Sequence, residues 1–396
     1  MSPRAKREFY YMMNTMLIVI LFAMGKFMLY DPYIKGHDDV NTNTLTAQAS
    51  DVVSEMPTVV QSKKITLIAV GDVMMHQSEL SAGYDKKTDT YNFDNLFTNI
   101  KSYLEGDIVY ANLETPVAGK ELKYSGYPNF NAPAELLTAL KNNNFTHLSL
   151  ANNHTLDRGA RGLTNTVKNV TDMGFTALGT RSDSKKVNFE ITEKNGLRVG
   201  FLSYTYGTNG LKLSDKNSFM LSYINKDQIK KDILDLKKEN IDAVIVTLHF
   251  GEEYKLTQNK FQEDIAKLAC DNGADIVLGS HPHVLQPIKY LNNGKCLVAY
   301  SLGNFISGMS ATYTDLGGIL KVEISIENDL LKTTPDFIGT WVKRSTDSSG
   351  LKNFTIVPLD VDKIPESIKI TKVEEARLKN YRNFIDTRIK TYTLKP

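Results

Sequence analysis

The stretch Ile65-Thr-Leu-Ile-Ala-Val-Gly-Asp72 decides the fold class, because an apolar run ends there in a glycine and a carboxylate. A short apolar run bounded by glycine is typical of a buried strand. Downstream of Asp72, similar runs alternate with amphipathic segments of helical length, which is the pattern of a domain with buried, largely parallel strands. We therefore expect residues 64–396 to form one α/β domain.

The expected elements fall into two groups along the chain. Strands that alternate with helices are predicted at Ile65–Val70, Asp107–Asn112, His147–Ala151, Val199–Tyr204, Ala243–Phe250, Ile276–Gly279 and Leu297–Ser301. The helices between them are predicted at Ala134–Asn143, Arg161–Met173, Asp227–Glu239 and Asn259–Asn272. After Gly317 the pattern predicts antiparallel strands at Ile319–Ile326, Asp336–Val342 and Phe354–Pro358, followed by a helix from Val373 to about Lys390.

Polar side chains follow the predicted strands at the points where the strands end. These residues are Asp72, Glu114, Asn153, His249, His281 and His283. Ligands of α/β sheets bind beyond the carboxyl ends of the strands, so we expect these side chains to converge on one rim. Mixed carboxylate, amide and imidazole ligands suit Zn, Mn or Fe and are too rich in nitrogen for Ca. A carboxylate with histidines on either side is one way to hold two divalent ions about 3.5–4 Å apart.

Each of these residues also has an ordinary structural interpretation. A single strand-end aspartate such as Asp72 is more often a helix cap, and His147, inside its strand, is expected to be a satisfied core residue. The segment His281-Pro-His283 differs, because proline favours an extended local backbone and two imidazoles that flank it seldom arise for packing alone.

The N-terminal segment is predicted to be a membrane anchor. A basic cluster precedes a mostly apolar stretch from Phe9 to Tyr30, and about 20 apolar residues span a bilayer as a helix. Positive charge before such a stretch keeps the start in the cytoplasm and sends the rest outward. We expect residues 1–30 to be a cytoplasmic start and signal anchor, in the bilayer through residues 10–30. The alternative is a signal peptide cut after Ala23-Met24-Gly25.

The anchor interpretation makes the protein single-pass, with its C-terminal domain outside the cytoplasm. Residues 31–63 lack periodicity and are rich in small polar side chains, as a flexible linker is. The whole chain has 47 basic and 45 acidic residues, a net charge of +2 that gives no electrostatic footprint for nucleic acid. Two cysteines, Cys270 and Cys296, exclude a disulfide scaffold or a cysteine-rich zinc module. We expect both to be buried thiols, and a bridge between them is the alternative.

Six blocks of the sequence resemble the signature blocks of CapA-type (PGA_cap) proteins. These are capsule or poly-γ-glutamate synthesis accessory proteins, a branch of the calcineurin-like metallophosphoesterases. The resemblance covers residues 65–307 in the family's order and spacing. The blocks are Gly71-Asp72, Asn112-Leu-Glu114, Ala151-Asn-Asn-His-Thr-Leu-Asp157, His249-Phe-Gly-Glu-Glu-Tyr254, Gly279-Ser-His-Pro-His-Val284 and Tyr300-Ser-Leu-Gly-Asn-Phe305.

The resemblance implies a four-layer sandwich of two β-sheets flanked by helices, with two divalent metal ions at one end. Carried over residue by residue, it implies that Asp72 and His283 hold the first ion. It also implies that Asn153, His249 and His281 hold the second ion and that Glu114 bridges both ions.

The same resemblance assigns catalytic roles beside the metal ligands. His154 matches the position that protonates or stabilises a leaving oxygen, and Asp157 would orient that imidazole. Glu253 is a candidate acid/base partner, and a solvated surface glutamate is the alternative.

Two departures from the phosphoesterase pattern make ordinary phosphatase activity less certain than metal binding. Met74 stands where those enzymes usually place a histidine, with His76 as the alternative ligand. The bridging residue is Glu114 where an aspartate is usual.

Three functions are compatible with this pattern. The first is a membrane-anchored component of an anionic capsule machine, for poly-γ-glutamate, whose metal site acts on or holds the polymer beside membrane synthase or export subunits. The second is an extracytoplasmic metal-dependent phosphoesterase, and the third is a non-catalytic assembly factor for a membrane synthase. Basic residues of the predicted last helix, among them Arg377 and Lys379, are either contacts for a polyanion or a solvated face.

Overall fold

The structure is a computed structural model that describes residues 63–346, 350, 352–359, 364 and 368–393. The predicted anchor, and the predicted linker up to residue 62, lie outside the described residues. Among the helices that are described, none has the length and apolar character needed to span a bilayer.

The larger of two main sheets combines parallel and antiparallel strands. Strands β1, β4, β5, β6 and β13 run parallel, whereas β14, β15 and β16 extend the sheet antiparallel beyond β1. In spatial order the sheet contains β16 (Lys352–Pro358), β15 (Leu330–Thr346), β14 (Leu316–Glu327), β1 (Lys64–Val73), β4 (Ile108–Leu113), β5 (His147–Ser149) and β6 (Thr176–Leu178), with β13 (Asn304–Ile306) paired to β1.

The second sheet is parallel at its centre and antiparallel at both edges. Its spatial order is β11 (Leu285–Leu291), β12 (Cys296–Leu302), β10 (Ile276–Ser280), β9 (Ala243–His249), β8 (Leu197–Thr205) and β7 (Glu190–Lys194). Every predicted strand is present. In the two main sheets, the strands that were not predicted are the three-residue strands β6 and β13 and the edge strands β7 and β11. Strand β7 is half exposed, and β11 contains a proline, which edge strands tolerate.

The two sheets face each other across a hydrophobic core. Along β1, Ile65, Leu67 and Ala69 point into this inner core, whereas Ile68 and Val70 point to the outer side. This alternation is the two-residue period of a strand whose two faces are both covered. Apolar side chains on both faces therefore make β1 a central strand between two cores.

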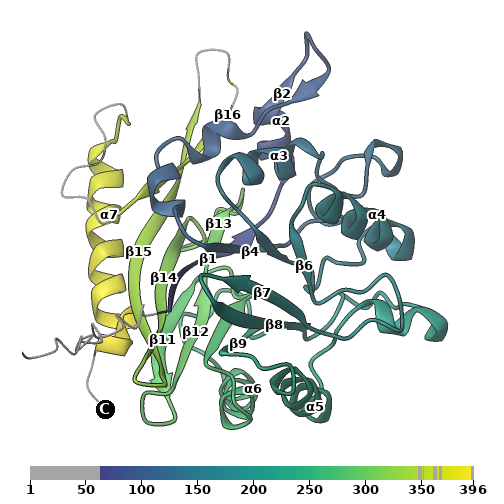
Figure 1. The fold of residues 1–396 in the computed structure, drawn as a ribbon. Coiled ribbons are helices and arrows are strands. Elements are labelled where there is room, and N and C mark those ends of the chain that lie inside the picture. Colours follow the sequence, from purple (N-terminus) through teal and green to yellow (C-terminus); the bar gives the residue numbers. More distant parts are fainter. Residues whose placement is uncertain (1–62, 347–349, 351, 360–363, 365–367, 394–396) are drawn as a thin grey trace, which may run out of the picture. The chain divides into compact units, whose positions relative to one another are not determined.

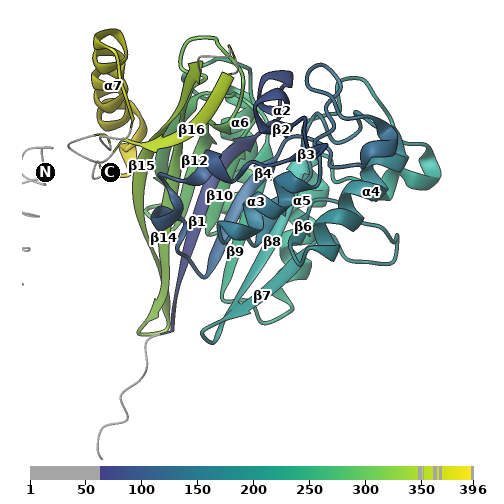
Figure 2. The same ribbon diagram turned by 90° about the horizontal axis from the view of Figure 1, so that it is seen from above.

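Helices cover the outer faces of both sheets. Apolar side chains of α3 (Glu135–Asn142) and α4 (Gly159–Asp172) pack on the larger sheet, and those of α5 (Lys226–Lys237) and α6 (Lys260–Asp271) pack on the second sheet. Figure 1 shows these two pairs on opposite sides of the sheets, and Figure 2 shows the strands side by side from above. The α/β prediction is confirmed, and the layers run helix, sheet, sheet, helix.

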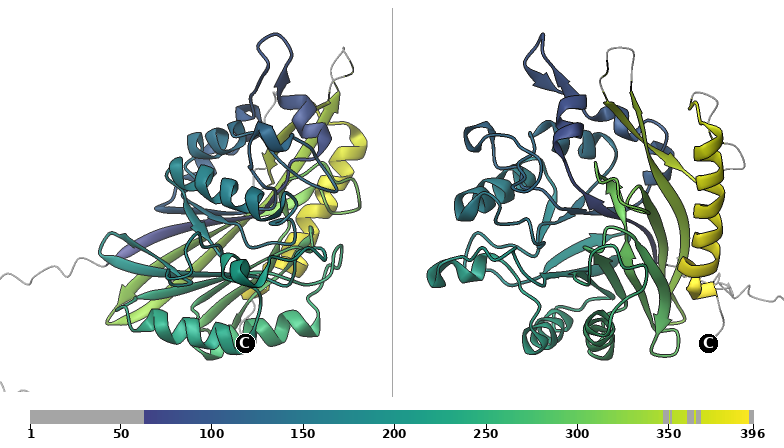
Figure 3. Two further views of the ribbon diagram at one scale, coloured as in Figure 1. Left: turned by 90° about the vertical axis from the view of Figure 1, so that its right-hand side faces the viewer. Right: turned by 180° about the vertical axis from the view of Figure 1, so that it is seen from behind.

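The last long helix, α7 (Lys372–Phe384), lies beside β15 (Figure 1 and Figure 3). Its Leu378 and Tyr381 join the core between the sheets. A capping box between Thr371 and Glu374 fixes where it begins. The short elements are α2 (Gln77–Gly83), the hairpin of β2 (Tyr84–Asp85) and β3 (Thr90–Tyr91), 3₁₀ turns at Asp94–Phe97, Lys101–Leu104, Lys120–Leu122, Asp215–Met220 and Thr391–Thr393, and a π-helical turn at Ile385–Ile389.

The expectation of two buried thiols is wrong, because Cys270 and Cys296 form a disulfide. Cys270 lies near the end of α6 and Cys296 begins β12, and their Cα atoms are 5.8 Å apart. Helix α6 packs on the sheet that contains β12, which brings together two cysteines that are 26 residues apart in the chain. Nothing in the spacing of two cysteines predicts that packing.

Candidate metal centre

The carboxyl ends of strands from both sheets meet and bring the predicted ligands together. Asp72 lies in β1 and Glu114 directly follows β4 in the larger sheet. His249 ends β9 in the second sheet, and His281 and His283 follow β10. All five side chains belong to residues that are at most 4% exposed. The strand-end pattern therefore corresponds to one buried cluster of carboxylates and imidazoles.

Glu114 lies at the middle of this cluster. Its carboxylate forms one group with His281 and His283 and a second group with Asp72 and His249. In each group, the candidate ligand atoms lie within 4.8 Å of one another. A carboxylate shared by two such groups has the location expected of a bridging ligand.

Contacts also link the residues that the resemblance assigns to each ion. Oδ2 of Asp72 lies 3.1 Å from Nδ1 of His283. The ring centroids of His249 and His281 are 4.9 Å apart, and Oδ1 of Asn153 lies 2.8 Å from Nε2 of His249. The structure thus brings together all six predicted ligands, while the assignment of each ligand to one ion stays a prediction.

The cluster contains buried polar atoms without partners. Within the described part of the chain, Oε1 of Glu114 and Nδ1 of His281 are buried and have no hydrogen-bond partner. Buried polar atoms in folded proteins are almost always hydrogen-bonded, and a bound ion is one explanation of an exception. Because carboxylate oxygens and neutral imidazole nitrogens are ligand atoms for divalent transition metals, these residues fit a metal site.

The electrostatics of the cluster favour a cation. Burial, and then the neighbouring charge of Asp72, raise the pKa of Glu114 well above its ordinary value. Burial, and then His281 and His283, lower the pKa of His249 well below its ordinary value. Burial also lowers the pKa of His281 to about 3. The imidazoles of His249 and His281 are therefore neutral and ready to act as ligands, and a positive ion would relieve the repulsion between the carboxylates of Asp72 and Glu114.

The expected extended backbone around Pro282 is wrong. His281 has a φ of 99° and His283 a φ of 58°, values that side-chain-bearing residues rarely adopt. Surrounding contacts hold this turn, since the amide of Tyr254 donates to the carbonyl of Pro282 at 2.8 Å. Backbone strain that the surrounding structure maintains is typical of functional sites.

Gly71 lets β1 deliver Asp72 to the cluster. A Cβ atom at residue 71 would lie 1.9 Å from the carbonyl oxygen of Gly303, so only glycine allows the two backbones to approach this closely. The amide of Asp72 donates to that same carbonyl at 2.9 Å. The pairing of β1 with β4 is irregular between Ala69 and Asp72. The Gly-Asp pair therefore marks a bulge that places the carboxylate.

Asn112, Ser280 and Asn304 orient the ligands, and the sequence analysis did not single them out as site residues. Nδ2 of Asn112 donates to Oδ1 of Asp72 at 2.8 Å. Oγ of Ser280 lies 2.9 Å from Nδ1 of His249, and Oδ1 of Asn304 lies 3.0 Å from Nδ1 of His283. Their signal was present, since all three lie within the quoted sequence blocks. Partners of this kind fix the orientation of ligand rings.

His154 and Asp157 form a buried pair. Nδ1 of His154 lies 2.8 Å from Oδ2 of Asp157, and both side chains are buried. The backbone amide of Phe130 donates to the same oxygen at 2.7 Å, and the Phe130 ring packs edge-on against His154 at 4.7 Å between centroids. The pair has the arrangement of an imidazole oriented by a carboxylate, as the sequence predicted.

Met74 and His76 are both outside the two groups of candidate ligands. Met74 is buried in the hydrophobic interior. Nδ1 of His76 accepts a hydrogen bond from the amide of Gly308 at 3.2 Å, and burial followed by the charge of His283 lowers the pKa of His76 to about 4. His76 is thus a neutral neighbour of the cluster.

Glu253 lies on an exposed segment after β9. Its charge adds to the causes that raise the pKa of Glu114 and the pKa of Tyr206. The Tyr206 ring packs against His281 at 4.6 Å between centroids, and Tyr254 faces His283 at 6.4 Å. Both tyrosines are partly exposed, so they border the cluster on its solvent side. The acid/base role of Glu253 stays a prediction.

Comparisons with known proteins agree with the sequence blocks. A family model described as "Bacterial capsule synthesis protein PGA_cap" matches residues 66–309. "Capsule biosynthesis protein CapA" of Bacillus anthracis is 35% identical over 265 residues, which are 64% of this chain and 62% of that protein. "PGA biosynthesis protein CapA" of Bacillus subtilis is 30% identical over 257 residues, which are 62% of this chain and 64% of that protein. The chain thus matches somewhat less than two thirds of the length of these relatives.

Solved structures align over a larger share of the chain at low identity. A putative 5'-nucleotidase from Staphylococcus aureus aligns with a TM-score of 0.43 and 12% identity, covering 82% of this chain and 59% of that chain. The Haemophilus influenzae NAD nucleotidase aligns with a TM-score of 0.41 and 12% identity, covering 83% of this chain and 64% of that chain.

The family match spans every predicted ligand, from Asp72 to His283, and continues through Asn304. It confirms the resemblance that the sequence blocks carry. This chain belongs to the bacterial capsule synthesis protein family PGA_cap.

Proposed function

We propose that this protein holds two divalent ions, Mn, Fe or Zn, and acts as a membrane-anchored, extracytoplasmic accessory protein in the synthesis of an anionic capsule polymer, poly-γ-glutamate. The observation that carries the metal part of the proposal is the location of Glu114. Its buried carboxylate belongs to two ligand groups and has one oxygen without a partner in the described chain. The six ligands would be Asp72, Glu114, Asn153, His249, His281 and His283.

The residues around the proposed ions have separate tasks. When bound, the ions would activate water or polarise a carbonyl or phosphoryl oxygen as Lewis acids. Asn112 and Asn304 hold Asp72 and His283 in place through the hydrogen bonds described above. His154, protonated on both ring nitrogens, would donate its Nε2 proton to a leaving atom, while the Asp157 carboxylate accepts a hydrogen bond from Nδ1–H and orients the ring.

The family supports the polymer part of the proposal. The relatives from Bacillus are named for capsule and PGA biosynthesis, and a Mycobacterium tuberculosis relative, 27% identical over 54% of this chain, is named a probable polyglutamine synthesis accessory protein. A polymer of glutamate presents one carboxylate per residue. A buried cation site with exposed tyrosines at its edge is suited to an anionic chain.

Two features support export and anchoring. The basic and apolar N-terminal sequence has the order of a signal anchor. The Cys270–Cys296 disulfide suits an oxidising compartment outside the cytoplasm. Protease added to intact cells should remove the domain that follows residue 63 while the protein fractionates with membranes. A soluble protein that protease reaches only after lysis would contradict this part of the proposal.

A second candidate function is a metal-dependent phosphoesterase, which the His154–Asp157 pair favours. An imidazole oriented by a buried carboxylate is the group that a general acid needs, whereas a protein that only binds polymer does not need one. This candidate uses the same ligands and differs in the bond that is cleaved.

One experiment in the source cells tests the proposed function. The chromosomal copy is replaced by a variant with His281→Ala and His283→Ala, and surface polymer is measured with the amount of protein in the membrane. We expect normal protein and little or no polymer. Normal polymer from cells whose variant protein contains no metal would contradict the role of the metal centre. The matched control is Lys295→Gln, at an exposed position in the turn between β11 and β12.

A further inference from the structure

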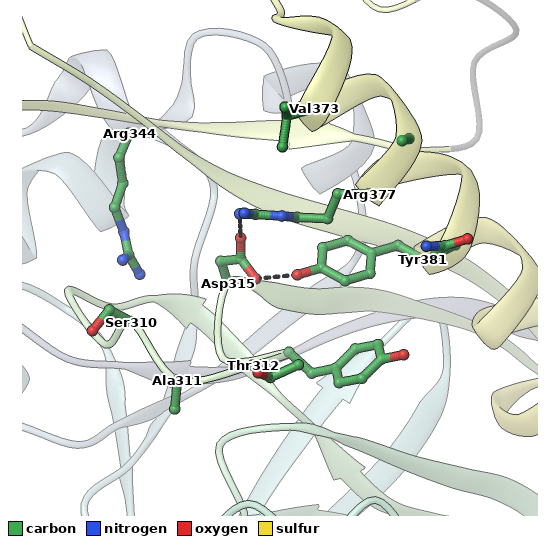
Figure 4. A pocket seen from close by; sticks show the side chains of 11 residues that line it. Ser310, Ala311, Thr312, Asp315, Arg344, Val373, Arg377 and Tyr381 are labelled. Carbon is green, nitrogen blue, oxygen red and sulfur yellow. Dashed lines mark hydrogen bonds and ion pairs between the residues drawn. The ribbon is translucent and has the colours of Figure 1, made fainter.

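A polar cavity of about 460 Å³ lies between α7, the end of β15 and the loop that joins β13 to β14. Ligand sites commonly have volumes of about 300–1,000 Å³. The wall includes two guanidinium groups, those of Arg344 and Arg377, and the polar side chains of Ser310, Thr312 and Asn380. Figure 4 shows both guanidinium groups pointing into the space from opposite sides.

One carboxylate also faces the cavity, but its charge is already compensated. Asp315 accepts a hydrogen bond from Nε1 of Trp341 at 3.1 Å and pairs with Nη1 of Arg377 at 3.2 Å. The hydroxyl of Tyr381 donates to its other oxygen, as Figure 4 shows. Asp315 therefore holds the side chains of Arg377 and Tyr381 in place in the cavity wall.

Arg344 carries the uncompensated charge. Its Nη2 donates to the carbonyl oxygens of Ser307 and Met309, and its Nε is buried without a partner in the described part of the chain. Among the described residues, no carboxylate lies within ion-pair distance of this guanidinium. With Arg377 and Asp315, the lining carries two positive charges and one negative charge.

The cavity borders the metal centre through one loop. Nδ2 of Asn304 donates to the carbonyl of Thr314 at 2.9 Å, while its Oδ1 contacts His283. The loop from residue 307 to residue 315 therefore starts beside the metal ligands and ends in the cavity wall. A chain long enough to reach the metal centre could place another of its groups here.

We propose that this cavity is a subsite for a carboxylate of an anionic polymer, held by Arg344 and Arg377 while a neighbouring part of the same chain lies at the metal centre. Guanidinium groups bind carboxylates through paired, charge-assisted hydrogen bonds. The hydroxyls of Ser310 and Thr312 and the amide of Asn380 add neutral donors. The inference rests on the proposed function, because the polymer named there supplies the carboxylates.

The test measures binding of a γ-linked glutamate decamer and of free glutamate to the full-length, metal-loaded chain by titration calorimetry. The variants are Arg344→Gln, Arg377→Gln and Ala376→Phe, the last of which fills the cavity without a change of charge. Lys295→Gln removes one positive charge from an exposed position in the turn between β11 and β12, outside the cavity lining, and is the matched control. Because the chain has a single tryptophan and Trp341 contacts Asp315, its fluorescence reports locally on the cavity.

We expect each cavity variant to weaken decamer binding roughly ten-fold or more, the usual effect of losing a hydrogen bond to a charged group. The control should change the affinity less than about two-fold, because an exposed charge contributes little. Metal content should be the same in all variants, and the decamer should alter the Trp341 fluorescence of the wild type and of Lys295→Gln but not that of the cavity variants.

Other outcomes distinguish a failure of the subsite proposal from a failure of the proposed function. Unchanged binding in the cavity variants, or equal loss in Lys295→Gln, would overturn the cavity as a subsite. If the variant with His281→Ala and His283→Ala then fails to bind the decamer, the proposed polymer role is supported without the cavity as a subsite. Wild-type protein that binds neither probe would overturn the subsite. If free glutamate binds as tightly as the decamer, and its binding depends on the same arginines, the cavity is a carboxylate site and the result contradicts a polymer ligand.

Discussion

Asp157 holds His154 in place: its Oδ2 lies 2.8 Å from Nδ1 of the imidazole and also accepts the amide of Phe130 at 2.7 Å. The carboxylate is thus anchored from two sides, and its contact with Nδ1 leaves the other ring nitrogen, Nε2, for the proposed proton transfer. His154 is beside Asn153 in the chain but is in neither group of candidate ligands. In the proposed function, His154 would therefore transfer a proton while the neighbouring ligands bind the metal.

Replacement of His154 tests this division of roles. We expect His154→Ala to keep its metal content and to lower turnover of the polymer, or of a chromogenic phosphate ester, by about 10²–10⁴-fold, the usual contribution of a general acid. Asp157→Asn should lower turnover less, because Asp157 only orients the imidazole. Polymer production that is unchanged in His154→Ala but lost in His281→Ala would identify a binding or assembly role instead. Loss of metal in His154→Ala as complete as in His281→Ala would show that His154 is a ligand.

The close approach of Gly71 to Gly303 makes a second prediction. In Gly71→Ala, the new Cβ would lie 1.9 Å from a backbone oxygen, so β1 or β13 must shift and carry Asp72 with it. We expect a loss of about 1–3 kcal/mol in the free energy of unfolding and lower metal content. Gly207→Ala is the control, since a Cβ there meets nothing within 4 Å. Metal content equal to that of the wild type would contradict the role of Gly71 in placing the carboxylate.

A buried histidine away from the metal centre gives a pH prediction. His147 lies between the hydroxyls of Thr146 and Thr192, each 2.8 Å away, and burial lowers its pKa to about 4. In the unfolded chain this imidazole titrates near pH 6.5, so below that pH the unfolded state binds the extra proton and stability falls. From pH 6.5 to pH 5 the loss is about 2 kcal/mol for this group.

The measurement is urea unfolding of the metal-free wild type and of His147→Gln across that pH range. Burial raises the pKa of Glu79 to about 7 and the pKa of Asp275 to about 6. These two carboxyl groups make the folded protein more stable as the pH falls, which opposes the effect of His147. The difference between the two proteins is therefore the quantity to compare. It should shrink by about 2 kcal/mol from pH 6.5 to pH 5. A constant difference would show that His147 is protonated in the folded protein.

The disulfide makes a fourth prediction. Replacing Cys270 and Cys296 by alanine together should lower the free energy of unfolding by about 2–4 kcal/mol, because the unfolded chain loses a cross-link. Reductant should destabilise the wild type by a similar amount and leave the double variant unchanged. Alkylation of protein from growing cells should find no free thiol before reduction. Two free thiols in protein trapped directly from cells would contradict both the disulfide and the oxidising location.

The sequence predicted the elements, and which polar side chains would lie together, because both depend on local patterns. Apolar runs such as Ile65–Val70 mark buried strands, and a polar residue at each strand end needs only the rule that parallel strands end on one edge. Asp72, Glu114 and His249 therefore follow from their neighbours in the chain. The antiparallel region after Gly317 also shows a local pattern, and β14 (Leu316–Glu327) confirms it.

Features that depend on distant packing were not predictable in this way. The Cys270–Cys296 bond requires α6 to lie on β12. The positive φ of His281 is maintained by surrounding contacts, which the backbone preference of a residue before proline does not take into account. Asn304 contacts His283 only because β13 pairs with β1, although the two are far apart in the chain. The cavity beside Arg344 likewise exists only where α7 meets a loop that precedes β14.

Metal analysis of the full-length protein tests the central claim most directly. Protein purified without chelator, or loaded with Mn, Fe or Zn after chelation, should hold about two ions per chain. Ca should compete poorly, because imidazoles dominate the ligand set. The variant with His281→Ala and His283→Ala should lose most of the metal, whereas Lys295→Gln should keep it. Wild-type protein that contains no metal as purified, and takes up none when these ions are added, would contradict the account.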